Sequence, residues 1–539
     1  MGATNVASPA VAPADGRGAA ERPVARRPSA AALAVAALTV AGAVVRVIVA
    51  HQSVFADELS TYWISATHSL GDVLSLLYST GRIHHAEITP PLSFLASWLT
   101  TQAGRSPELL RLAALVAGTA TIPLVYLLGL RTVTRRAAAL AAALTALSPF
   151  MIYYSAEARA YGLLMFLVAA STLSMLVAID TGRRRWWVVY AVCSALAFYT
   201  HYTCLFVLGV QLVWVLWTEP AARRPALLAS GAAVVLVLPW VPGLIEDLRS
   251  PTVKILSALS AFTPNAIRVD VQHWALGYPY TVAGGLRELP GVPALVLLGA
   301  SGLLVAAGVA RAALRGGTGW SSPSRRVVLV VALMLATPVG EIIASAVGNH
   351  IIGVRDLAAS WPYLALSGSA LVFAAGPALG AAAALLAVGA FGLGAARMLE
   401  SRFARPNFQA PADYIAMHGR RGDVVIDGTG PLSPGPLTGF QIVFHRPLPV
   451  VRALAPAEDD HPFNFTTPIV PIPVAFQRAV GAAHGGRIFI VSVRLAARPT
   501  GPSLTPAALP GGYRRCSQRR YEGFVITLVS VYSSSCAAS

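Results

Sequence analysis

The chain has 539 residues, of which 55% are hydrophobic and only 12% are charged. A soluble domain carries about 25% charged residues, so the composition excludes an ordinary soluble protein and predicts that most of the chain lies in lipid. The formal net charge of +17 would suggest a nucleic-acid partner in a soluble protein. Here the arginines form short clusters between apolar runs, which indicates membrane topology and no nucleic-acid surface.

The N-terminal segment 1–29 is rich in Ala, Pro and Gly and carries several arginines. This composition cannot bury a core, so we expect a disordered basic tail in the cytoplasm. The apolar run 30–50 follows, and it has about the 20 residues that a helix needs to cross a membrane. A cleaved signal peptide is the alternative, but its apolar core is only about 7–15 residues long. We therefore predict a retained first span.

Further apolar runs predict an α-helical polytopic membrane protein with about eleven transmembrane helices. Arginine clusters at 131–136, 182–185, 222–224 and 311–326 fall in alternate loops, so these loops are expected to be cytoplasmic. The transmembrane domain spans 30–397, and its loops 51–107, 243–290 and 348–358 are then extracytoplasmic. The predicted spans after the first are 108–130, 137–152, 161–180, 187–201, 203–217, 226–242, 291–310, 327–347, 359–375 and 377–397.

The first outer loop contains apolar residues at helical spacing. Leu70, Val73, Leu74 and Leu77 alternate with polar residues in the pattern of an amphipathic helix. A helix in the membrane interface and a helix packed inside the loop would show the same spacing. Either arrangement predicts an ordered loop.

The C-terminal segment 398–539 is less apolar, and short apolar runs alternate there with Pro and Gly turns. This pattern predicts a small extracytoplasmic α/β domain without a catalytic motif. Cys516 and Cys536 would pair if this end faces an oxidising compartment, although spacing alone does not establish their geometry. Cys193 and Cys204 are interpreted as small buried hydrophobes. The apolar runs read as strands are 423–427, 440–444, 487–493 and 524–532.

Ionisable residues are concentrated at the predicted outer ends of the spans. Such residues are costly at a membrane face unless they are paired or hydrated, so their position marks candidate functional sites. All of the clusters map to the same face of the membrane. They are Asp57 and Glu58; Arg82, His84, His85 and Glu87; Tyr153, Tyr154, Glu157, Arg159 and Tyr161; His201 and Tyr202; and His350, Arg355 and Asp356.

Each cluster alone also has a structural interpretation. A carboxylate at a helix start is commonly a cap, a lone histidine is usually a hydrogen-bonded core residue, and "TPPL" (89–92) is a turn before a helix. The segment "AEARAY" (156–161) would also suit an ion pair between helices. The conjunction of five clusters on one face favours a functional site.

These residues resemble the glycosyltransferase C superfamily over roughly residues 30–365. Within it they are similar to bacterial relatives of the dolichyl-phosphate-mannose protein mannosyltransferases and of the aminoarabinose lipid A transferase. The family opens its first outer loop with an Asp-Glu pair, matched by Asp57 and Glu58, and places an acid before Pro-Pro-Leu, matched by Glu87 in "EITPPL". "YSAEARAY" (154–161) and "THY" (200–202) also match segments of bacterial members.

Two positions depart from the family pattern. Asp356 follows Arg355 where the family has a tyrosine, and Thr89 stands where the mannosyltransferases have a histidine before the prolines. The fit is therefore to the broad family and not to protein O-mannosylation.

The resemblance implies a membrane glycosyltransferase that moves a sugar, such as mannose or arabinose, from a polyprenyl-phosphate carrier to an acceptor hydroxyl outside the cytoplasm, with inversion. A carboxylate then takes the proton of the hydroxyl, and Asp57 is the expected general base. The leaving phosphate needs positive charge, for which Arg159, Arg355 and His201 are candidates, with Lys254 and His84-His85 behind them. Glu58 is predicted, together with Asp57, to be a catalytic residue. Glu58 and Glu87 are expected to orient the acceptor or to hold the first outer loop in place.

The predicted site thus has two catalytic carboxylates and a set of binding residues. Tyr154 and Tyr161 are expected to stack on sugar or to line the prenyl groove. The acceptor- or donor-binding residues are Glu87, His84, His85, Tyr154, Glu157, Arg159, Tyr161, His201, Tyr202 and Arg355.

Residue types at this site also suit a divalent metal, but their spacing gives no coordination shell, so we expect that no cofactor is required. The expected partners are the polyprenyl-phosphate sugar, a glycan, glycolipid or protein acceptor, and the bilayer of the cell membrane. A lipid-linked-sugar transporter or flippase is the alternative function. Transporters commonly contain repeats and place charges near the membrane midplane, and the sequence shows neither feature.

Overall fold

The computed structural model describes most of the chain and leaves several segments outside the description. The N-terminal tail, His84, His85 and Lys254 are among the residues that lie outside it. The described ranges are 30–78, 87–250, 262–279, 284–314, 324–348, 352–430, 437–454, 469–495 and 504–536.

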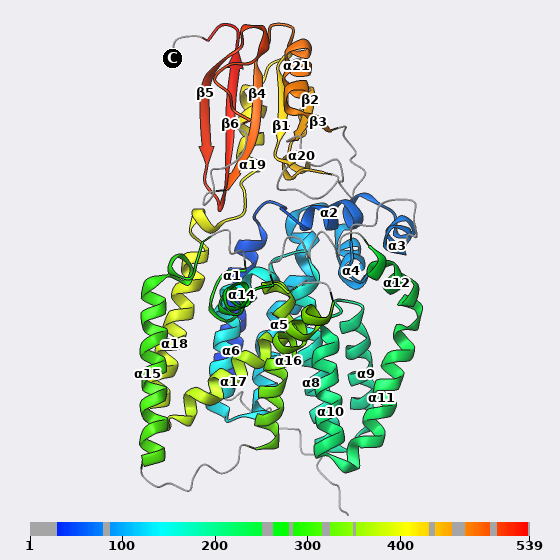
Figure 1. The fold of residues 1–539 in the computed structure, drawn as a ribbon, viewed down its shortest axis with the longest axis vertical. Helices are drawn as coiled ribbons and strands as arrows, with labels where there is room; N and C mark the ends of the chain where they lie inside the picture. The colour runs from blue at the N-terminus through cyan, green and yellow to red at the C-terminus, as the bar shows by residue number, and fades with distance from the viewer. Residues whose placement is uncertain are drawn as a thin grey trace, which may run out of the picture.

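A bundle of long helices forms the larger part of the molecule, and a smaller sheet domain covers one end of it (Figure 1). Within the described ranges, eight helical units are long and apolar enough to cross a membrane, and a bent pair would make a ninth. These are the helices of a multi-span membrane protein. The eight are α1 (Ala30–Ala50), α5 (Pro107–Thr132), α8 (Ala160–Thr181), η1-α11-η2-α12 (Pro220–Arg249), η4-α15 (Arg287–Leu314), α16 (Arg325–Val347), η5-α17 (Val354–Ala374) and α18 (Pro377–Met398).

Every apolar run predicted as a span is helical, but three runs do not form a simple long helix. The run 137–152 is split into α6 (Arg135–Leu147) and α7 (Pro149–Ser155), which meet at 59°. The helices α9 (Arg184–Phe198) and α10 (Cys204–Thr218) have 15 residues each. At about 1.5 Å per residue they are shorter than the apolar core of a bilayer, which is about 30 Å thick. The count of about eleven spans therefore stays a prediction.

Short helices lie at the end of the bundle that faces the sheet domain, and α2 and α3 are among those nearest to it (Figure 1). The amphipathic helix predicted in the first loop is confirmed as α3, in which Val73 and Leu77 are buried while Leu70 and Leu74 are exposed. The loop is thus packed against the bundle on one side. The short helices here are α2 (Glu58–Thr67), α3 (Leu70–Tyr78), α4 (Leu92–Thr101), α12 (Val241–Arg249) and α14 (Pro264–Leu276).

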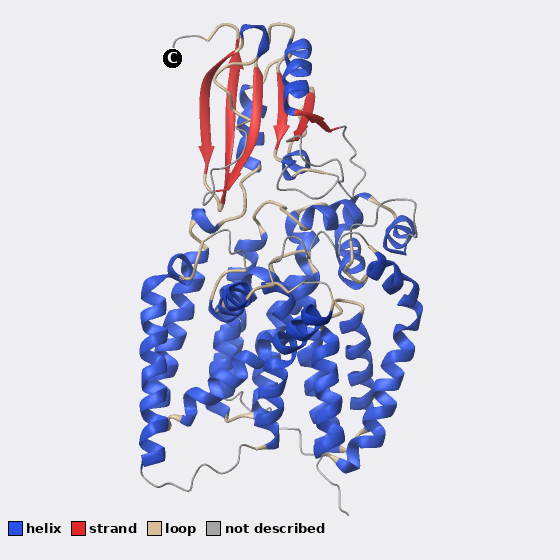
Figure 2. Cartoon of the chain, viewed as in Figure 1, coloured by secondary structure: helices blue, strands red, loops and turns tan. Residues whose placement is uncertain are grey.

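The described part of the sheet domain contains six strands in the order β3-β2-β1-β4-β6-β5 (Figure 2). The strands β3, β2, β1 and β4 are parallel to one another, whereas β6 runs antiparallel to both β4 and β5. The strands are β1 (Val424–Gly428), β2 (Val450–Leu454), β3 (Ile469–Pro471), β4 (Ile488–Leu495), β5 (Arg514–Tyr521) and β6 (Val525–Ser533).

Helices cover both faces of this sheet, which explains why its central strands are continuous apolar runs. Val424 and Ile426 of β1 pack in one core with α21 (Ile472–Ala483). Val425, which points to the other face, packs with residues of α19 (Gln409–His418). Three of the predicted strand segments, around 424–427, 488–493 and 525–532, are confirmed as β1, β4 and β6.

The fourth predicted strand, 440–444, is wrong because this segment forms the helix α20 (Gly439–Val443). The Thr438 side chain accepts a hydrogen bond from the backbone N–H of Gln441, and the Gln441 side chain accepts one from the backbone N–H of Thr438. This reciprocal capping box starts a helix and outweighs the strand preference of the apolar residues.

The sheet domain rests directly on the start of the first loop. The Phe55 and Phe524 rings are 5.5 Å apart, and the backbone N–H of Arg405 donates to Gln52 Oε1 at 3.0 Å. Gly439 lies so close that a Cβ at this position would be 2.8 Å from the carbonyl oxygen of Val54. The loop segment that leads to Asp57 is therefore held between the bundle and the sheet domain.

Candidate active site

The structure brings all five sequence clusters together at the end of the bundle nearest the sheet domain. An ion pair joins Asp57 to Arg355, and Glu58 Oε1 accepts a hydrogen bond from the backbone N–H of Ala158. Arg159 pairs with Glu87, and His201 Nε2 lies 3.9 Å from Asp356 Oδ1. Each cluster is thus connected to at least one other, as the conjunction in the sequence predicted. His84 and His85 lie outside the described residues.

Asp57 precedes α2 but does not cap it, since its side chain makes no capping hydrogen bond. Its carboxylate pairs with Arg355, and its side chain keeps 31% of its surface exposed. Burial acts to raise the pKa of Asp57, but the guanidiniums of Arg355 and Arg159 outweigh burial and hold that pKa below its ordinary value. Ala56 has a φ of +53°, a costly conformation for alanine that turns the chain just before this carboxylate.

Glu58 is fully buried and is bound on several sides. Arg111 donates from Nε and Nη2 to its two oxygens at 2.7 Å each, and Arg405 Nη1 lies 3.3 Å from Oε2. Burial raises the pKa of Glu58, but these two guanidiniums and the Ala158 N–H outweigh it and lower the pKa. The same carboxylate therefore ties the first loop to α5, to the segment before α8 and to the chain beyond α18.

Arg159 forms a second buried ion pair beside the first. Its Nη1 lies 3.1 Å from both oxygens of Glu87, and its Nη2 donates to Thr89 Oγ1 at 3.1 Å. Ser60 of α2 also donates to Glu87. Thr89, the residue at which the sequence departs from the mannosyltransferases, is thus an arginine ligand in this site.

Glu157 interacts electrostatically with Glu58 and Arg159, one member of each ion pair, and its hydrogen-bonding capacity is only partly satisfied. Its Oε1 accepts a hydrogen bond from the Tyr153 hydroxyl at 3.3 Å, whereas its Oε2 has no partner among the described residues. Burial, followed by the negative charge of Glu58, raises the pKa of Glu157 to about 7. Nitrogen atoms of Arg159 and Arg405 also lack partners within the described ranges. Buried polar atoms of this kind are candidates to bind a polar ligand.

Replacing Glu157 by glutamine is expected to change how stability depends on pH. Between the ordinary glutamate pKa of about 4.3 and about 7, the folded protein holds a proton that the unfolded chain releases. The contribution of Glu157 to stability therefore falls as the pH rises through this window. The unfolding midpoint of Glu157→Gln relative to the natural chain should rise between about pH 5 and about pH 8. A constant difference across this range would contradict the raised pKa.

His201 lies beside Asp356 and interacts electrostatically with Arg355 and Arg159. Its Nδ1 is 3.0 Å from Thr203 Oγ1, and its ring centroid is 5.5 Å from that of Tyr161. Burial, together with the positive charges of Arg355 and Arg159, lowers the pKa of His201 to about 3. The imidazole is therefore neutral at physiological pH and would contact a phosphate as a hydrogen-bond donor, in place of the cation that the sequence suggested.

The tyrosines differ in their relation to the site. Tyr154 and Tyr161 are buried, and their ring centroids lie 4.7 Å apart, so both belong to the packed wall beneath the carboxylates. Tyr202 points elsewhere: its hydroxyl donates to Asp247 of α12 and accepts from Trp240 Nε1 at 2.9 Å. These contacts join the turn before α10 to η2 and α12.

Sequence reasoning missed the two arginines that bind Glu58. Arg111 lies one turn inside α5 and is fully buried, and Arg405 lies in the link between α18 and the sheet domain. A charge inside an apolar span is a strong signal, and it would have identified Arg111. Arg405 carries no such signal. Among the described residues, no group of three or more His, Cys, Asp or Glu side chains is placed to hold a metal ion.

Comparison with known proteins gives one family match and several weak structural ones. The crystal structure of ArnT from Cupriavidus metallidurans bound to undecaprenyl phosphate is 14% identical, with a TM-score of 0.49 and coverage of 92% of this chain and 97% of that one. Archaeal oligosaccharyltransferase AglB from Archaeoglobus fulgidus is also 14% identical, with a TM-score of 0.43 and coverage of 72% and 58%. No curated protein matches the sequence.

The segment that matches the family model supplies some of the residues of the site. Residues 88–242 match the model described as dolichyl-phosphate-mannose-protein mannosyltransferase, a segment that contains Arg111, Glu157, Arg159 and His201. It leaves out Asp57, Glu58 and Arg355, which the fold brings to the same place. The chain thus resembles the glycosyltransferase C superfamily, as its motifs predicted.

Proposed function

We propose that this protein is an inverting glycosyltransferase that moves a sugar from a polyprenyl-phosphate carrier to an acceptor hydroxyl. The observation that carries the proposal is the partly exposed Asp57 carboxylate beside the guanidiniums of Arg355 and Arg159. A base for a hydroxyl and a positive site for a phosphate are the two groups that this transfer needs. The family match over residues 88–242 supports the same reaction class.

The proposed transfer is a single displacement. The acceptor oxygen attacks the anomeric carbon, the bond from this carbon to the phosphate oxygen breaks, and its electron pair leaves with the polyprenyl phosphate. Asp57 takes the proton of the acceptor hydroxyl. Arg355 and Arg159 offset the negative charge that develops on the phosphate, and neutral His201 donates a hydrogen bond to it.

The ion pair between Asp57 and Arg355 implies that the donor binds before Asp57 acts as a base. A carboxylate paired with a guanidinium is a weak base, as the lowered pKa of Asp57 indicates. A donor phosphate offers Arg355 a second anion, so Asp57 becomes more basic when the donor is bound. We therefore propose that donor binding activates the base.

We propose that the N-terminal tail is cytoplasmic and that the site and the sheet domain lie outside the cytoplasm. The arginine clusters in alternate loops support this orientation. Cys516 and Cys536 form a disulfide in the sheet domain, a bond typical of oxidising compartments. The site and the sheet domain lie at the same end of the bundle (Figure 1).

We also propose that no metal is required. Three carboxylates of the site, Asp57, Glu58 and Glu87, are each bound by a guanidinium. Arginine already supplies the positive charge that a divalent cation would bring to a phosphate. Sugar transfer should therefore continue in the presence of EDTA, and recovery of a lost activity by Mg²⁺ or Mn²⁺ would contradict this part.

The proposed reaction is tested with the purified full chain in lipid vesicles. Polyprenyl-phospho-mannose and polyprenyl-phospho-arabinose are supplied separately, with an envelope extract as the source of acceptor. We expect free polyprenyl phosphate to form from at least one donor only when the extract is present, with an inverted anomeric configuration in the product by NMR. If the intact donor instead crosses the vesicle membrane without cleavage, the protein is a transporter and the proposal is wrong.

A further inference from the structure

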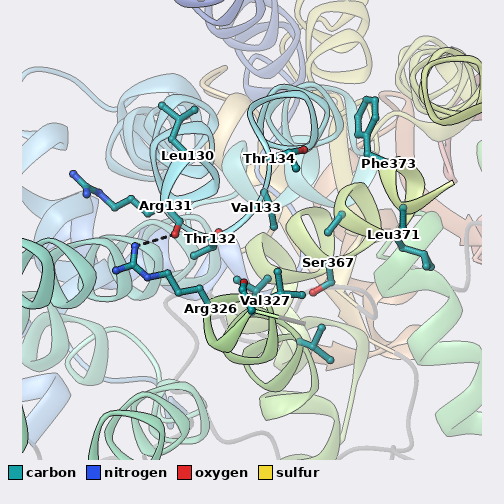
Figure 3. A pocket seen from close by; sticks show the side chains of 15 residues that line it. Leu130, Arg131, Thr132, Val133, Thr134, Arg326, Val327, Ser367, Leu371 and Phe373 are labelled. Atoms are coloured by element: carbon teal, nitrogen blue, oxygen red, sulfur yellow. Dashed lines mark hydrogen bonds between the residues drawn. The ribbon is translucent and has the colours of Figure 1, made fainter. Parts of the chain in front are cut away.

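A cavity of about 630 Å³ lies at the end of the helical bundle remote from the candidate active site (Figure 3). The last turn of α5, the turn that follows it, the first turns of α16 and the last turns of α17 surround it. The other end of α5 carries Arg111, which binds Glu58. Arg111 and Leu130 lie near opposite ends of α5, and at about 1.5 Å of rise per residue this helix separates the cavity from the active site by about 30 Å.

The wall of this cavity is mostly apolar, with polar side chains at several places around it (Figure 3). Leu130, Val330 and Phe373 belong to the apolar part. Ser367 of α17 also lines the cavity, and its hydroxyl is shielded from solvent with no hydrogen-bond partner in the described part of the chain. A mostly apolar space with an unsatisfied hydroxyl would suit a ligand that is itself amphipathic.

Two arginines at the edge of the cavity share a single carboxylate. Arg131 Nη1 lies 2.9 Å from Asp180 Oδ2, and Arg326 pairs with the other oxygen of Asp180. Arg326 Nη1 also donates to the Arg131 carbonyl oxygen at 3.1 Å (Figure 3). The trio carries a net charge of +1, and about a third of each arginine side chain is exposed. The remaining positive charge is therefore available to bind an anion.

We propose that this cavity binds one anionic glycerophospholipid of the surrounding membrane. Its phosphate would contact Arg131 and Arg326, since guanidinium groups bind phosphate oxygens in a two-pronged geometry. One acyl chain would occupy the apolar part of the cavity. Basic pockets between transmembrane helices are suited to such head groups. This inference depends on the membrane embedding of the bundle and is independent of the proposed sugar transfer.

The test compares lipids with the purified full chain in detergent. Phosphatidylglycerol should raise the thermal unfolding midpoint and should be retained in native mass spectra, whereas phosphatidylcholine should do neither. Inorganic phosphate should also have no effect, because it lacks the acyl chain that the cavity takes. Equal effects of the two lipids would overturn the proposal, and so would an equal effect of phosphate.

Variants distinguish this cavity from the rest of the basic surface. Arg326→Gln should weaken phosphatidylglycerol binding about tenfold, since one charge-assisted contact is lost. Ala370→Trp should block binding by filling the cavity without changing any charge, and Asp180→Asn should strengthen binding by freeing both arginines. The matched control is Arg184→Gln, which changes an exposed arginine outside the cavity. Binding that survives Ala370→Trp would place the lipid elsewhere and overturn the proposal.

Discussion

Replacing Asp57 by asparagine is expected to reduce sugar transfer by about 10²–10⁴-fold, the usual contribution of a general base. The amide keeps the size of the side chain and its place beside Arg355, but it cannot take a proton from the acceptor hydroxyl. Because the Asp57 side chain is 31% exposed, loss of its ion pair should cost little stability. The measurement is the initial rate of polyprenyl phosphate release in vesicles, together with the thermal unfolding midpoint.

The matched control is Asp72→Asn, which changes another aspartate of the same loop. Asp72 is exposed on α3, and its carboxylate accepts a hydrogen bond from the neighbouring Ser69 hydroxyl at 2.6 Å. This variant should transfer sugar at nearly the natural rate. If Asp57→Asn retained full activity while bound donor was still cleaved, Asp57 would not be the base. Glu157, the nearby carboxylate with an unpartnered oxygen, would then be the next candidate.

The sequence predicted which residues gather at the site because the membrane fixes so much of the arrangement. Apolar runs determine where the chain crosses, and arginine clusters determine which loops share a side. Polar residues at the ends of consecutive spans then have to meet at one face. Asp57, Glu87, Arg159 and Arg355 follow from this reasoning, although they are separated by up to 298 positions in the chain.

The pairing of these residues could not be predicted in the same way. Glu58 and Asp57 are adjacent in sequence, yet one is fully buried between two arginines and the other is partly exposed. This difference depends on the direction of the chain at Ala56 and on the position of Arg405, which belongs to the link to a separate domain. Both are consequences of tertiary packing, and neither has a local pattern in the sequence.

Local sequence patterns also gave a wrong prediction where two of them favoured different secondary structures. The segment 440–444 has the apolar composition of a strand, but the hydrogen bonds of Thr438 and Gln441 start a helix there. Strand β5 was not predicted, because its eight residues include four arginines and show no apolar alternation. It forms at the edge of the sheet because β6 provides a partner. Charged residues are common on such edge strands.

Replacing Glu58 by glutamine is expected to destabilise the protein by about 3–5 kcal/mol, the usual cost of removing one partner from a buried ion pair. Arg111 and Arg405 are almost completely buried, so without the carboxylate two positive charges remain in an environment that water does not reach. We expect the thermal unfolding midpoint to fall sharply. The control, Glu522→Gln, removes an exposed pair with Arg520 and should change stability by less than about 1 kcal/mol.

The same variant separates the roles of the two adjacent carboxylates. At a temperature where Glu58→Gln is still folded, it should retain much more transfer activity than Asp57→Asn, because Glu58 has no exposed surface through which to contact an acceptor. The transfer rate and the unfolding midpoint should thus change independently. Asp57→Asn should lower the transfer rate and leave the midpoint nearly unchanged, whereas Glu58→Gln should lower the midpoint first. An unchanged midpoint combined with complete loss of transfer would instead make Glu58 a catalytic residue.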